Sequence, residues 1–425
     1  MKLSEPPVSV SLDKIPPLAE LAALWQELES RAKPSFFLTW SWIGNWLTSI
    51  ERHRAQGWLL SARRQGTLVG LAVVFEAPIR RRLLPMGRAA FVNETGIAEF
   101  DALCIEHNDF LMDARWQAAV REAMFDRLCA AGSNWREVHL QRASVEVDAS
   151  ARKLPSSVYR QGQVRDSCLV DLLRVRERGG DYLGMLGAGR RAHIRRCLRA
   201  YAAVGPLTLT EAPDVPTALA FLDRLIVLHD KRWLDRGAAS EFSTPFCRAF
   251  HERLVRDALP RGEIQLLRLT AGRQDLGYLY SFVHEGQVCF YQSGYAYDLL
   301  DPKYSPGLVT LVMAIQHNAA KGMAAFDFLA GNQAYKAALA TNRAEMVSWT
   351  LQRRSALSTA EMAIRWKLRL ARRLWARLCG VAARRGVRAV AGVLCLGAMA
   401  AAGAAIVDAE IFDFLLGPAV GSNAT

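Results

Sequence analysis

The stretch Tyr291-Gln-Ser-Gly-Tyr295, followed by Lys303-Tyr-Ser-Pro-Gly-Leu308 and by Phe326-Asp-Phe-Leu-Ala-Gly331, decides the fold that we predict. The three pieces read in order as the end of a strand, the start of a helix and a second strand that leads into a polar loop. This order is typical of a β–helix–β unit in an α/β sheet. Ligands bind to such sheets in the crevice outside the carboxyl ends of the strands. We therefore look for a site where these pieces meet.

The second piece has the signature of a helix N-terminus. Ser305 stands at the N-cap position, Pro306 at the first helical position and Gly307 at the second. The first amides of a helix have no partner within it, and the helix dipole adds partial positive charge, so a phosphate can bind there. The pattern fits an ordinary capped helix packed on a sheet equally well, and the motif alone leaves both interpretations open.

Strand-like runs surround this helix. Three of them, separated by Gly-containing turns, precede it, and a short apolar run follows it. They are Ile264–Thr270, Leu276–Val283, Gln287–Gly294 and Ala324–Leu329. The sequence therefore predicts a meander that continues into the β–helix–β unit.

A similar organisation occurs earlier in the chain. Residues 59–70 resemble residues 266–277, with Gly70 and Gly277 at equivalent places. A strand at 83–92, a helix near 115–131 and a strand at 137–141 follow the first copy. We therefore predict two related α/β halves. The first copy lacks the Ser-Pro-Gly helix start and a Tyr-Lys pair, so we expect it to act as a scaffold and substrate wall.

Five ordered motifs resemble the CelD/BcsL-type (BioF2-like) acyltransferases of the GNAT superfamily and, distantly, the FemABX transferases. They are Phe36-Phe-Leu-Thr-Trp-Ser-Trp42, Arg190-Arg-Ala-His-Ile-Arg-Arg196, Tyr291-Gln-Ser-Gly-Tyr295, Tyr304-Ser-Pro-Gly307 and Phe326-Asp-Phe…Gly331…Tyr335-Lys336. The resemblance covers roughly residues 20 to 350. It implies an α/β fold of tandem GNAT-like domains with mixed sheets flanked by helices. It also implies acyl-CoA as a cosubstrate, no permanently bound cofactor, and a role in modifying envelope or exopolysaccharide precursors.

We predict four parts of the chain. Residues 1–165 form a non-catalytic GNAT-like domain and residues 166–355 the acyltransferase domain, with the connection at 142–180. Residues 356–388 form a basic amphipathic helix and residues 389–407 a candidate transmembrane helix. The stretch 389–407 also fits a buried Ala-rich helix. The positive-inside bias places the basic segment, which suits an anionic membrane surface, on the cytoplasmic side.

Charge and cysteine usage exclude other classes. Of the net charge of +13, much lies in residues 351–390, so the body is less basic than is usual for a chain that reads tRNA. We do not expect a nucleic-acid partner. The eight cysteines form no CxxC pair, which favours a reducing compartment and no metal site. The N-terminus does not read as a signal peptide, so we expect a cytoplasmic catalytic body.

The resemblance implies a direct transfer, in which an amine or hydroxyl attacks the thioester. We take Asp327 as the base or orienting carboxylate, Lys336 as the group that stabilises negative charge, and Tyr335 as the residue that orients the acceptor or protonates the thiolate. Asn332 occupies the acidic position of the family motif, which leaves Asp327 as the carboxylate of this stretch. The residues expected to bind acyl-CoA are Gln292, Ser293, Ser305, Gly307, Leu308, Arg190 and Arg191.

Arg190 and Arg191 begin a helix that reads either as a solvated surface or as a cationic wall for a phosphorylated ligand. A β-bulge expected after Tyr291–Gly294 would offer backbone amides to the donor.

The leading hypothesis is an acyl-CoA-dependent acyltransferase acting on a small-molecule or lipid-linked saccharide at the inner face of the cytoplasmic membrane. Two alternatives remain: an aminoacyl-tRNA-dependent FemABX-like transferase, and a non-catalytic, membrane-tethered binding module in polysaccharide assembly.

Overall fold

The computed structural model describes residues 7–81, 84–130, 134–238, 240, 242, 244–301, 303–331, 333–356, 358–360, 363, 366 and 370. The chain divides into two compact units, Met1–Pro78 with Arg88–Gln352, and Ile79–Gly87 with Arg353–Thr425. Apart from residues 79–87, both copies of the predicted α/β pattern lie in the first unit. Asn332, most of the predicted basic helix at 356–388 and all of the stretch 389–407 lie outside the described residues.

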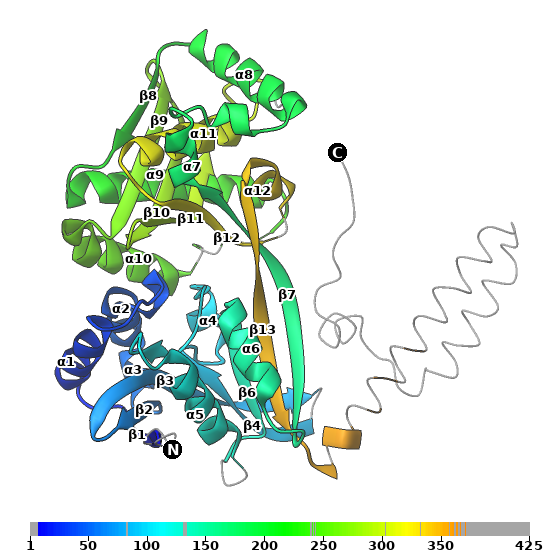
Figure 1. Ribbon diagram of the computed structural model, residues 1–425. Helices are drawn as coiled ribbons and strands as arrows, with labels where there is room; N and C mark the ends of the chain where they lie inside the picture. Colours follow the sequence, from blue (N-terminus) through cyan, green and yellow to red (C-terminus); the bar gives the residue numbers. More distant parts are fainter. Residues whose placement is uncertain are drawn as a thin grey trace, which may run out of the picture. The chain divides into compact units, whose positions relative to one another are not determined.

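The elements follow one another in two rounds of strands and helices (Figure 1). The strands are β1 (Ser9–Lys14), β2 (Trp58–Arg64), β3 (Thr67–Arg81), β4 (Leu84–Val92), β5 (Leu111–Met112), β6 (Glu137–Ala143), β7 (Val158–Asp171), β8 (Leu207–Glu211), β9 (Ile264–Ala271), β10 (Gln274–His284), β11 (Gln287–Tyr295), β12 (Ala325–Ala330) and β13 (Asn342–Arg353). The α-helices are α1 (Leu18–Glu29), α2 (Trp40–Ser49), α3 (Glu51–Arg54), α4 (Ala98–Asp101), α5 (Gln117–Cys129), α6 (Val145–Lys153), α7 (Leu172–Glu177), α8 (Ala188–Ala202), α9 (Val215–Leu234), α10 (Pro245–Ala258), α11 (Pro306–Ala320) and α12 (Ala334–Leu339). Short 3-10 helices lie at Phe36–Leu38 (η1), Leu183–Met185 (η2) and Leu259–Arg261 (η4).

The strands form one mixed sheet. Their order is β1-β2-β3-β4-β6-β13-β7-β12-β11-β10-β9-β8, and β5 pairs with β3. In the first half, β4 pairs with β6 in parallel, and α5 lies between them in the chain. In the second half, β11 pairs with β12 in parallel, and α11 lies between them. The structure thus confirms two related α/β halves, each a meander followed by a β–helix–β unit.

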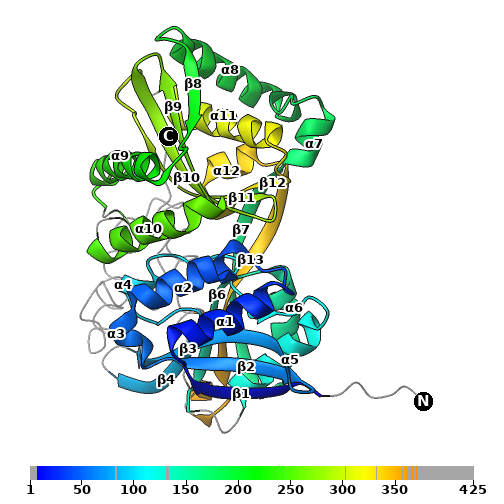
Figure 2. The same ribbon diagram turned by 90° about the vertical axis from the view of Figure 1, so that its left-hand side faces the viewer.

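The halves exchange their last strands. β7 follows the first half in the chain but pairs with β12 of the second, whereas β13 follows the second half but pairs with β6 of the first. Figures 1 and 2 show β7 and β13 running side by side between the halves. The predicted connection at 142–180 is therefore α6, the 14-residue strand β7 and α7. The sequence did not predict β7, because the central residues of this strand are exposed on both faces and show no alternation of apolar and polar residues.

Gly70 and Gly277 occupy equivalent bulges. Pairing shifts by one residue beside Gly70 in the β2–β3 hairpin and beside Gly277 in the β9–β10 hairpin. A Cβ atom at Gly70 would lie 2.5 Å from the Val120 side chain on α5, and one at Gly277 would lie 3.0 Å from the Thr310 hydroxyl on α11. Each glycine lets the helix of its half approach the sheet, which explains why the two segments resemble each other.

Helices cover both faces of each half-sheet. In the first half, α5 packs against one face, where Ala72 and Val74 of β3 point. Leu71, Val73 and Phe75 of β3 point to the other face, toward the core that holds α1 and α2. In the second half, α11 covers one face, and α9 and α10 cover the other. Figure 2 shows α2 and α10 lying next to each other where the halves meet.

An aromatic cluster joins the halves. Phe36 of η1 stacks on Phe282 of β10, with ring centroids 4.4 Å apart, and Trp42 of α2 contacts Phe250 of α10 at 5.0 Å. The same core includes Phe37 and Trp46. Phe36, Phe37 and Trp42 come from the aromatic motif near the N-terminus, and the structure places them in the core. Trp40 of that motif is half-buried and faces a cavity.

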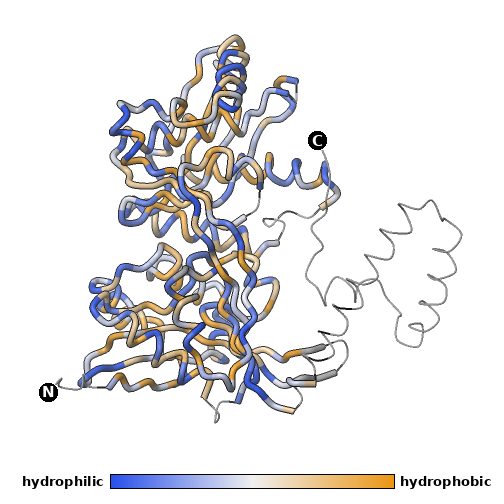
Figure 3. The backbone as a smooth tube through the Cα atoms, turned by 45° about the vertical axis from the view of Figure 1, so that its right-hand side comes forward, coloured by the Kyte–Doolittle hydropathy of each residue, from blue (hydrophilic) through white to orange (hydrophobic). Residues whose placement is uncertain are grey.

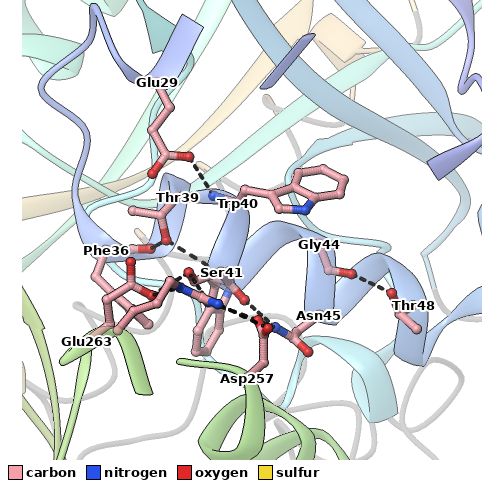
Figure 4. A network of polar contacts seen from close by, with 12 residues as sticks. Glu29, Phe36, Thr39, Trp40, Ser41, Gly44, Asn45, Thr48, Asp257 and Glu263 are labelled. Carbon is pink, nitrogen blue, oxygen red and sulfur yellow. Dashed lines mark hydrogen bonds and ion pairs between the residues drawn. The ribbon is translucent and has the colours of Figure 1, made fainter. Parts of the chain in front are cut away.

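A polar network reinforces the same contact (Figure 4). Ser41 of α2 donates a hydrogen bond to Glu263, and Asn45 donates one of 2.7 Å to Asp257 of α10. Arg261 donates to Ser41 at 2.8 Å and to Asp257 at 3.0 Å. The halves are thus joined by exchanged strands, aromatic packing and charged hydrogen bonds, so we expect them to hold one relative position.

Candidate active site

A cavity of about 490 Å³ lies beside the end of β11, beyond the residues at which β11 pairs with β12. Residues of α9, the end of β11, the start of α11 and the start of α12 line it. Six of the predicted site residues lie in this lining: Gln292, Ser293, Ser305, Gly307, Leu308 and Tyr335. Cavities of a few hundred cubic ångströms are the usual size for small-molecule sites. We name this space the donor cavity.

The separation of the two strands has a local cause. β11 and β12 pair only at Gln287–Cys289 with Ala325–Asp327. Directly afterwards Tyr291 is an extra residue in β11, because Tyr280 pairs with Gln292 while the next residue, Ser281, pairs with Phe290. A bulge bends its strand and increases the local twist. We expected this bulge after Tyr291–Gly294, but it lies at Tyr291, the first residue of that segment.

The helix start forms one wall of the donor cavity. Ser305 caps α11 as predicted, since its side chain accepts a hydrogen bond of 3.3 Å from the Leu308 amide. Gly307 lies in the first turn, where amides have no partner within the helix. A Cβ atom at Gly307 would lie 3.1 Å from the Tyr295 ring, so glycine keeps the wall open at this point.

Basic and aromatic side chains from the end of α9, together with Arg236 just beyond it, form another wall. Arg232, Trp233 and Arg236 line the donor cavity. The Arg232 guanidinium lies 4.3 Å from the centroid of the Tyr297 ring. Its Nε atom is buried and has no hydrogen-bond partner among the residues that the structure describes. A buried guanidinium N–H without a partner is costly, so this wall is suited to an anionic group.

Arg190 and Arg191 stand elsewhere. They lie in the first turn of α8, and neither is part of the donor-cavity lining. The tube of α8 is mostly hydrophilic in Figure 3, in agreement with its few buried residues, Ile194, Cys197 and Tyr201. Within the donor cavity, Arg232 and Arg236 supply the positive charge that we expected from Arg190 and Arg191 of α8.

Tyr335 faces the donor cavity from the start of α12. Its ring contacts Phe328 edge to face, with centroids 6.3 Å apart. Burial raises the pKa of Tyr335 to about 12, so its hydroxyl keeps its proton at neutral pH. Such a hydroxyl can donate a hydrogen bond or a proton to a leaving thiolate.

Asp327 does not line the donor cavity. It lies on β12 between Phe326 and Phe328, which belong to the core around α11, so alternation along the strand turns it to the opposite face. There its Oδ2 atom lies 2.7 Å from Nε2 of His107. The Leu329 amide donates to Oδ1 at 2.7 Å. Asp327 and His107 line a second cavity of about 580 Å³, which we name the second cavity.

Lys336 is buried behind the end of β12. Its Nζ atom donates to the Ala330 carbonyl at 2.9 Å and lies 3.4 Å from the Leu329 carbonyl. A Cβ atom at Gly331 would lie 2.9 Å from this Nζ atom, which explains the glycine between strand and helix. The lysine holds the strand end, and its charge partly offsets the increase that burial causes in the pKa of Glu106.

Glu106 and His107 come from the first half. Glu106 accepts a 2.6 Å hydrogen bond from the Ala330 amide. Burial raises the pKa of Glu106 even though this bond and the charges of Arg142, Lys336 and His107 act in the opposite direction. Burial also acts to lower the pKa of His107, but the hydrogen bond and charge of Asp327 outweigh it, so the pKa of His107 is raised.

Backbone strain gathers around these residues. Non-glycine residues with positive φ include Cys104, His107, Arg142 and Leu329, at 52°, 47°, 49° and 61°. They are linked through short contacts: Arg142 donates to the Ile105 carbonyl at 2.6 Å, and the Leu329 amide donates to Asp327. Strained residues persist only where their surroundings over-determine them, and they cluster at functional sites.

Glu106, His107 and Arg232 were not among the site residues that we predicted from the sequence. The segment Cys104-Ile-Glu-His-Asn-Asp109 is a dense polar run between apolar residues, and this composition could have drawn attention to it. Nothing local indicated that it contacts β12, which lies more than two hundred positions further along the chain. Arg232 carries no motif of its own, and α9 has the pattern of an ordinary amphipathic helix with Leu222, Leu225 and Ile226 buried.

Comparison with known proteins agrees with the second half of this architecture. Residues 188–337 match the model of the acetyltransferase (GNAT) domain family. These residues therefore form a GNAT acetyltransferase domain, and the protein is a transferase with an α/β fold. The narrower resemblance to CelD/BcsL-type enzymes stays a prediction. No curated protein matches the sequence.

Solved structures similar to this chain include FemX, with a TM-score of 0.48 and 9% identity over 80% of this chain and 96% of that chain. L-PGS from Bacillus licheniformis has a TM-score of 0.47 and 13% identity over 84% of this chain and 96% of that chain. A tandem GNAT protein from the clavulanic acid biosynthesis pathway has a TM-score of 0.39 and 12% identity over 80% and 98% of the two chains.

The His107–Asp327 pair predicts a pH-dependent contribution to stability. Because the pKa of His107 is raised in the folded state, the contribution is fully present below the ordinary histidine pKa of about 6.5 and is lost as the pH rises through the raised value. The difference in free energy of unfolding between wild type and His107→Gln should therefore be larger at about pH 6 than at about pH 9. Urea unfolding at both pH values measures it, and a difference that grows with pH would contradict the assignment.

Proposed function

We propose that the protein transfers an acyl group from acyl-CoA to an amine or hydroxyl of an envelope or exopolysaccharide precursor. The observation that carries the donor assignment is the donor cavity itself. It combines splayed parallel strands, the start of α11 and a basic wall on α9. Acyl-CoA has a pyrophosphate and a narrow pantetheine arm, which match an open helix start and a slot between two strands.

The chemistry follows from the placement of these groups. The pyrophosphate would lie at the first turn of α11, beside Gly307, with Arg232 neutralising phosphate charge. The pantetheine arm would extend between the strands past Gln292 and Ser293. The acceptor would attack the thioester carbonyl directly, and Tyr335 would protonate the departing thiolate. Lys336 would act from behind the strand end by holding the carbonyls of Leu329 and Ala330 in place.

The envelope or polysaccharide acceptor rests on the family resemblance of the sequence. We further propose that the catalytic body is tethered to the inner face of the cytoplasmic membrane by the C-terminal tail. The alternating Arg, Leu and Trp of residues 365–377 and the uncharged stretch 389–407 support this proposal. No helix among the described residues is long and apolar enough to cross a membrane.

The tether is tested with vesicles and the full-length protein. It should sediment with vesicles that contain phosphatidylglycerol and should bind less to phosphatidylcholine vesicles, because each basic residue near an anionic surface contributes roughly 1 kcal/mol. If the protein is found in the pellet of neither kind of vesicle, the proposed membrane tether is wrong.

The donor assignment is tested at Gly307. Gly307→Glu places a carboxylate at the first turn of α11, so CoA should bind at least about tenfold more weakly, a loss of about 1.4 kcal/mol. Isothermal titration calorimetry with CoA measures this, and a thermal melt shows whether the variant is folded. Gly189→Glu is the matched control, because a Cβ atom at Gly189 on α8 would meet no heavy atom within 4 Å.

Each outcome assigns the phosphate site. Weaker binding in Gly307→Glu alone supports the donor cavity. Weaker binding in Gly189→Glu alone would move the phosphate site to α8, with Arg190 and Arg191 as its ligands. A wild-type protein that binds no CoA would contradict the proposed donor.

A further inference from the structure

The second cavity is built by both halves of the chain. Its volume is about 580 Å³, similar to that of the donor cavity. Phe36 and Phe110 supply aromatic surface from the first half, and Gln287, Cys289 and Asp327 belong to β11 and β12 of the second. More than half of its lining residues are polar or charged, which suits a small polar molecule rather than an apolar one.

The second cavity adjoins the place where a donor would lie. Gln287 and Cys289 line it from β11, and Gln292 and Ser293 of the same strand line the donor cavity a few residues later. Asp327 on β12 is the last residue that pairs with β11 before the strands separate. A thioester held between the separated strands would therefore be close to the end of the second cavity at which Asp327 and His107 stand.

His107 lines this cavity, and one of its two ring nitrogens forms no hydrogen bond with a described residue. Its Nε2 atom is engaged with Asp327, and no described residue forms a hydrogen bond with Nδ1. The side chain is 28% exposed, compared with 6% for Asp327. Ser35 donates to the His107 carbonyl at 3.1 Å, and the Asn108 amide donates to the Arg142 carbonyl at 3.2 Å. These bonds hold the strained backbone of His107 and thereby fix the direction of its ring.

The charges around the second cavity favour a cationic ligand. Asp109 is neutralised by Arg121, with an Nη2–Oδ2 distance of 2.7 Å, and Asp327 is engaged with His107. Glu146 and Glu285 remain, and among the lining residues Lys33 opposes them as a cation, while His284 is a further titratable group. The pKa of Glu146 is lowered by hydrogen bonds at the start of α6, so this carboxylate is ionised at neutral pH. The lining is thus net negative in a chain whose overall charge is +13.

We propose that the second cavity binds the acceptor as a primary ammonium ion on a small polar molecule, and that Nδ1 of His107 is the general base that deprotonates it. This inference rests on the proposed function and adds the chemical class of the acceptor and a catalytic residue that comes from the first half. Asp327 is then a positioning residue, because it acts on the reaction through the imidazole.

The transfer balances as follows. The ammonium group gives one proton to Nδ1 of His107 and becomes a neutral amine, whose lone pair attacks the thioester carbonyl carbon. The C–N bond forms and the C–S bond breaks, so that CoA leaves as a thiolate. The second proton lost by nitrogen is transferred to the sulfur through Tyr335, and His107 returns its proton to solvent. The products are an amide, CoA thiol and one released proton.

The pH dependence follows from the groups that face His107. Asp327 from β12, Glu106 from the same loop and Glu146 from α6 all favour the imidazolium, which raises the pKa of His107 against the effect of burial. Lys336 and Arg142 lie near Glu106 and weaken its influence. Only the neutral imidazole can accept a proton, so activity should rise with pH through the raised pKa of His107. Asp327→Asn removes a favourable charge, which should move this rise to lower pH.

The test uses the full-length protein with acetyl-CoA as the donor and two acceptor probes, glucosamine and glucose, which differ in one amino group. We expect N-acetylation of glucosamine and little transfer to glucose. His107→Gln should lower kcat by about 10²–10⁴-fold and remove the acidic limb of the pH profile, as expected for loss of a general base. His317→Gln is the matched control. Its Nε2 atom lies 2.9 Å from Glu211 and its side chain is 29% exposed, but it lines neither cavity.

Calorimetry with CoA separates this inference from the proposed function. If wild type and His107→Gln bind CoA equally while only the variant loses transfer, the assignment of His107 is supported. Unchanged kcat and an unchanged acidic limb in His107→Gln would overturn it. Transfer to glucose but not to glucosamine, or to neither while CoA still binds, would overturn the amine class. Absence of CoA binding in the wild type would instead contradict the proposed donor.

Discussion

Parallel pairing between β11 and β12 ends after three residue pairs, and the candidate site depends on this interruption. Beyond it, Tyr291 is an extra residue in β11. On its other side β12 stays paired with β7 as far as Ala330, whose amide donates to Glu106. On β12 the backbone groups beyond this point are taken up by Asp327, Glu106 and Lys336, so the end of β11 has no partner strand on this side and faces the donor cavity. In a regular sheet the backbone groups of the two strands would be hydrogen-bonded to each other along their whole length, and no opening would remain.

The second half does not complete the site alone. Buried charges are stable only when they are paired or hydrogen-bonded, and both Asp327 and the end of β12 find their partners on the loop that carries Glu106 and His107. That loop belongs to the first half. The exchanged strands β7 and β13, the aromatic contact of Phe36 with Phe282 and the Ser41–Glu263 hydrogen bond keep the halves in register. The first half therefore contributes chemistry as well as support, whereas the sequence suggested a scaffold and a wall.

Local patterns predicted much of this structure. The capped start of α11, the meander of β9 to β11 and the repeat marked by Gly70 and Gly277 were all recognisable, because each depends on residues close together in the chain. Five residues expected to bind the donor, and Tyr335, line one cavity for the same reason. The exchange of β7 and β13 was not predictable, because the central residues of β7 are exposed and show no hydrophobic periodicity. The contact between His107 and Asp327 joins distant segments, and one sequence contains no information that pairs them.

The central claim is that acyl-CoA binds between the separated ends of β11 and β12. A crystal structure of the full-length protein with CoA tests it most directly. The account predicts the pyrophosphate at the first turn of α11 beside Gly307, a phosphate oxygen on Arg232, and the thiol between Ser293 and Tyr335, on the side toward His107. CoA bound along α8, or a donor cavity that stays empty at saturating CoA, would contradict it.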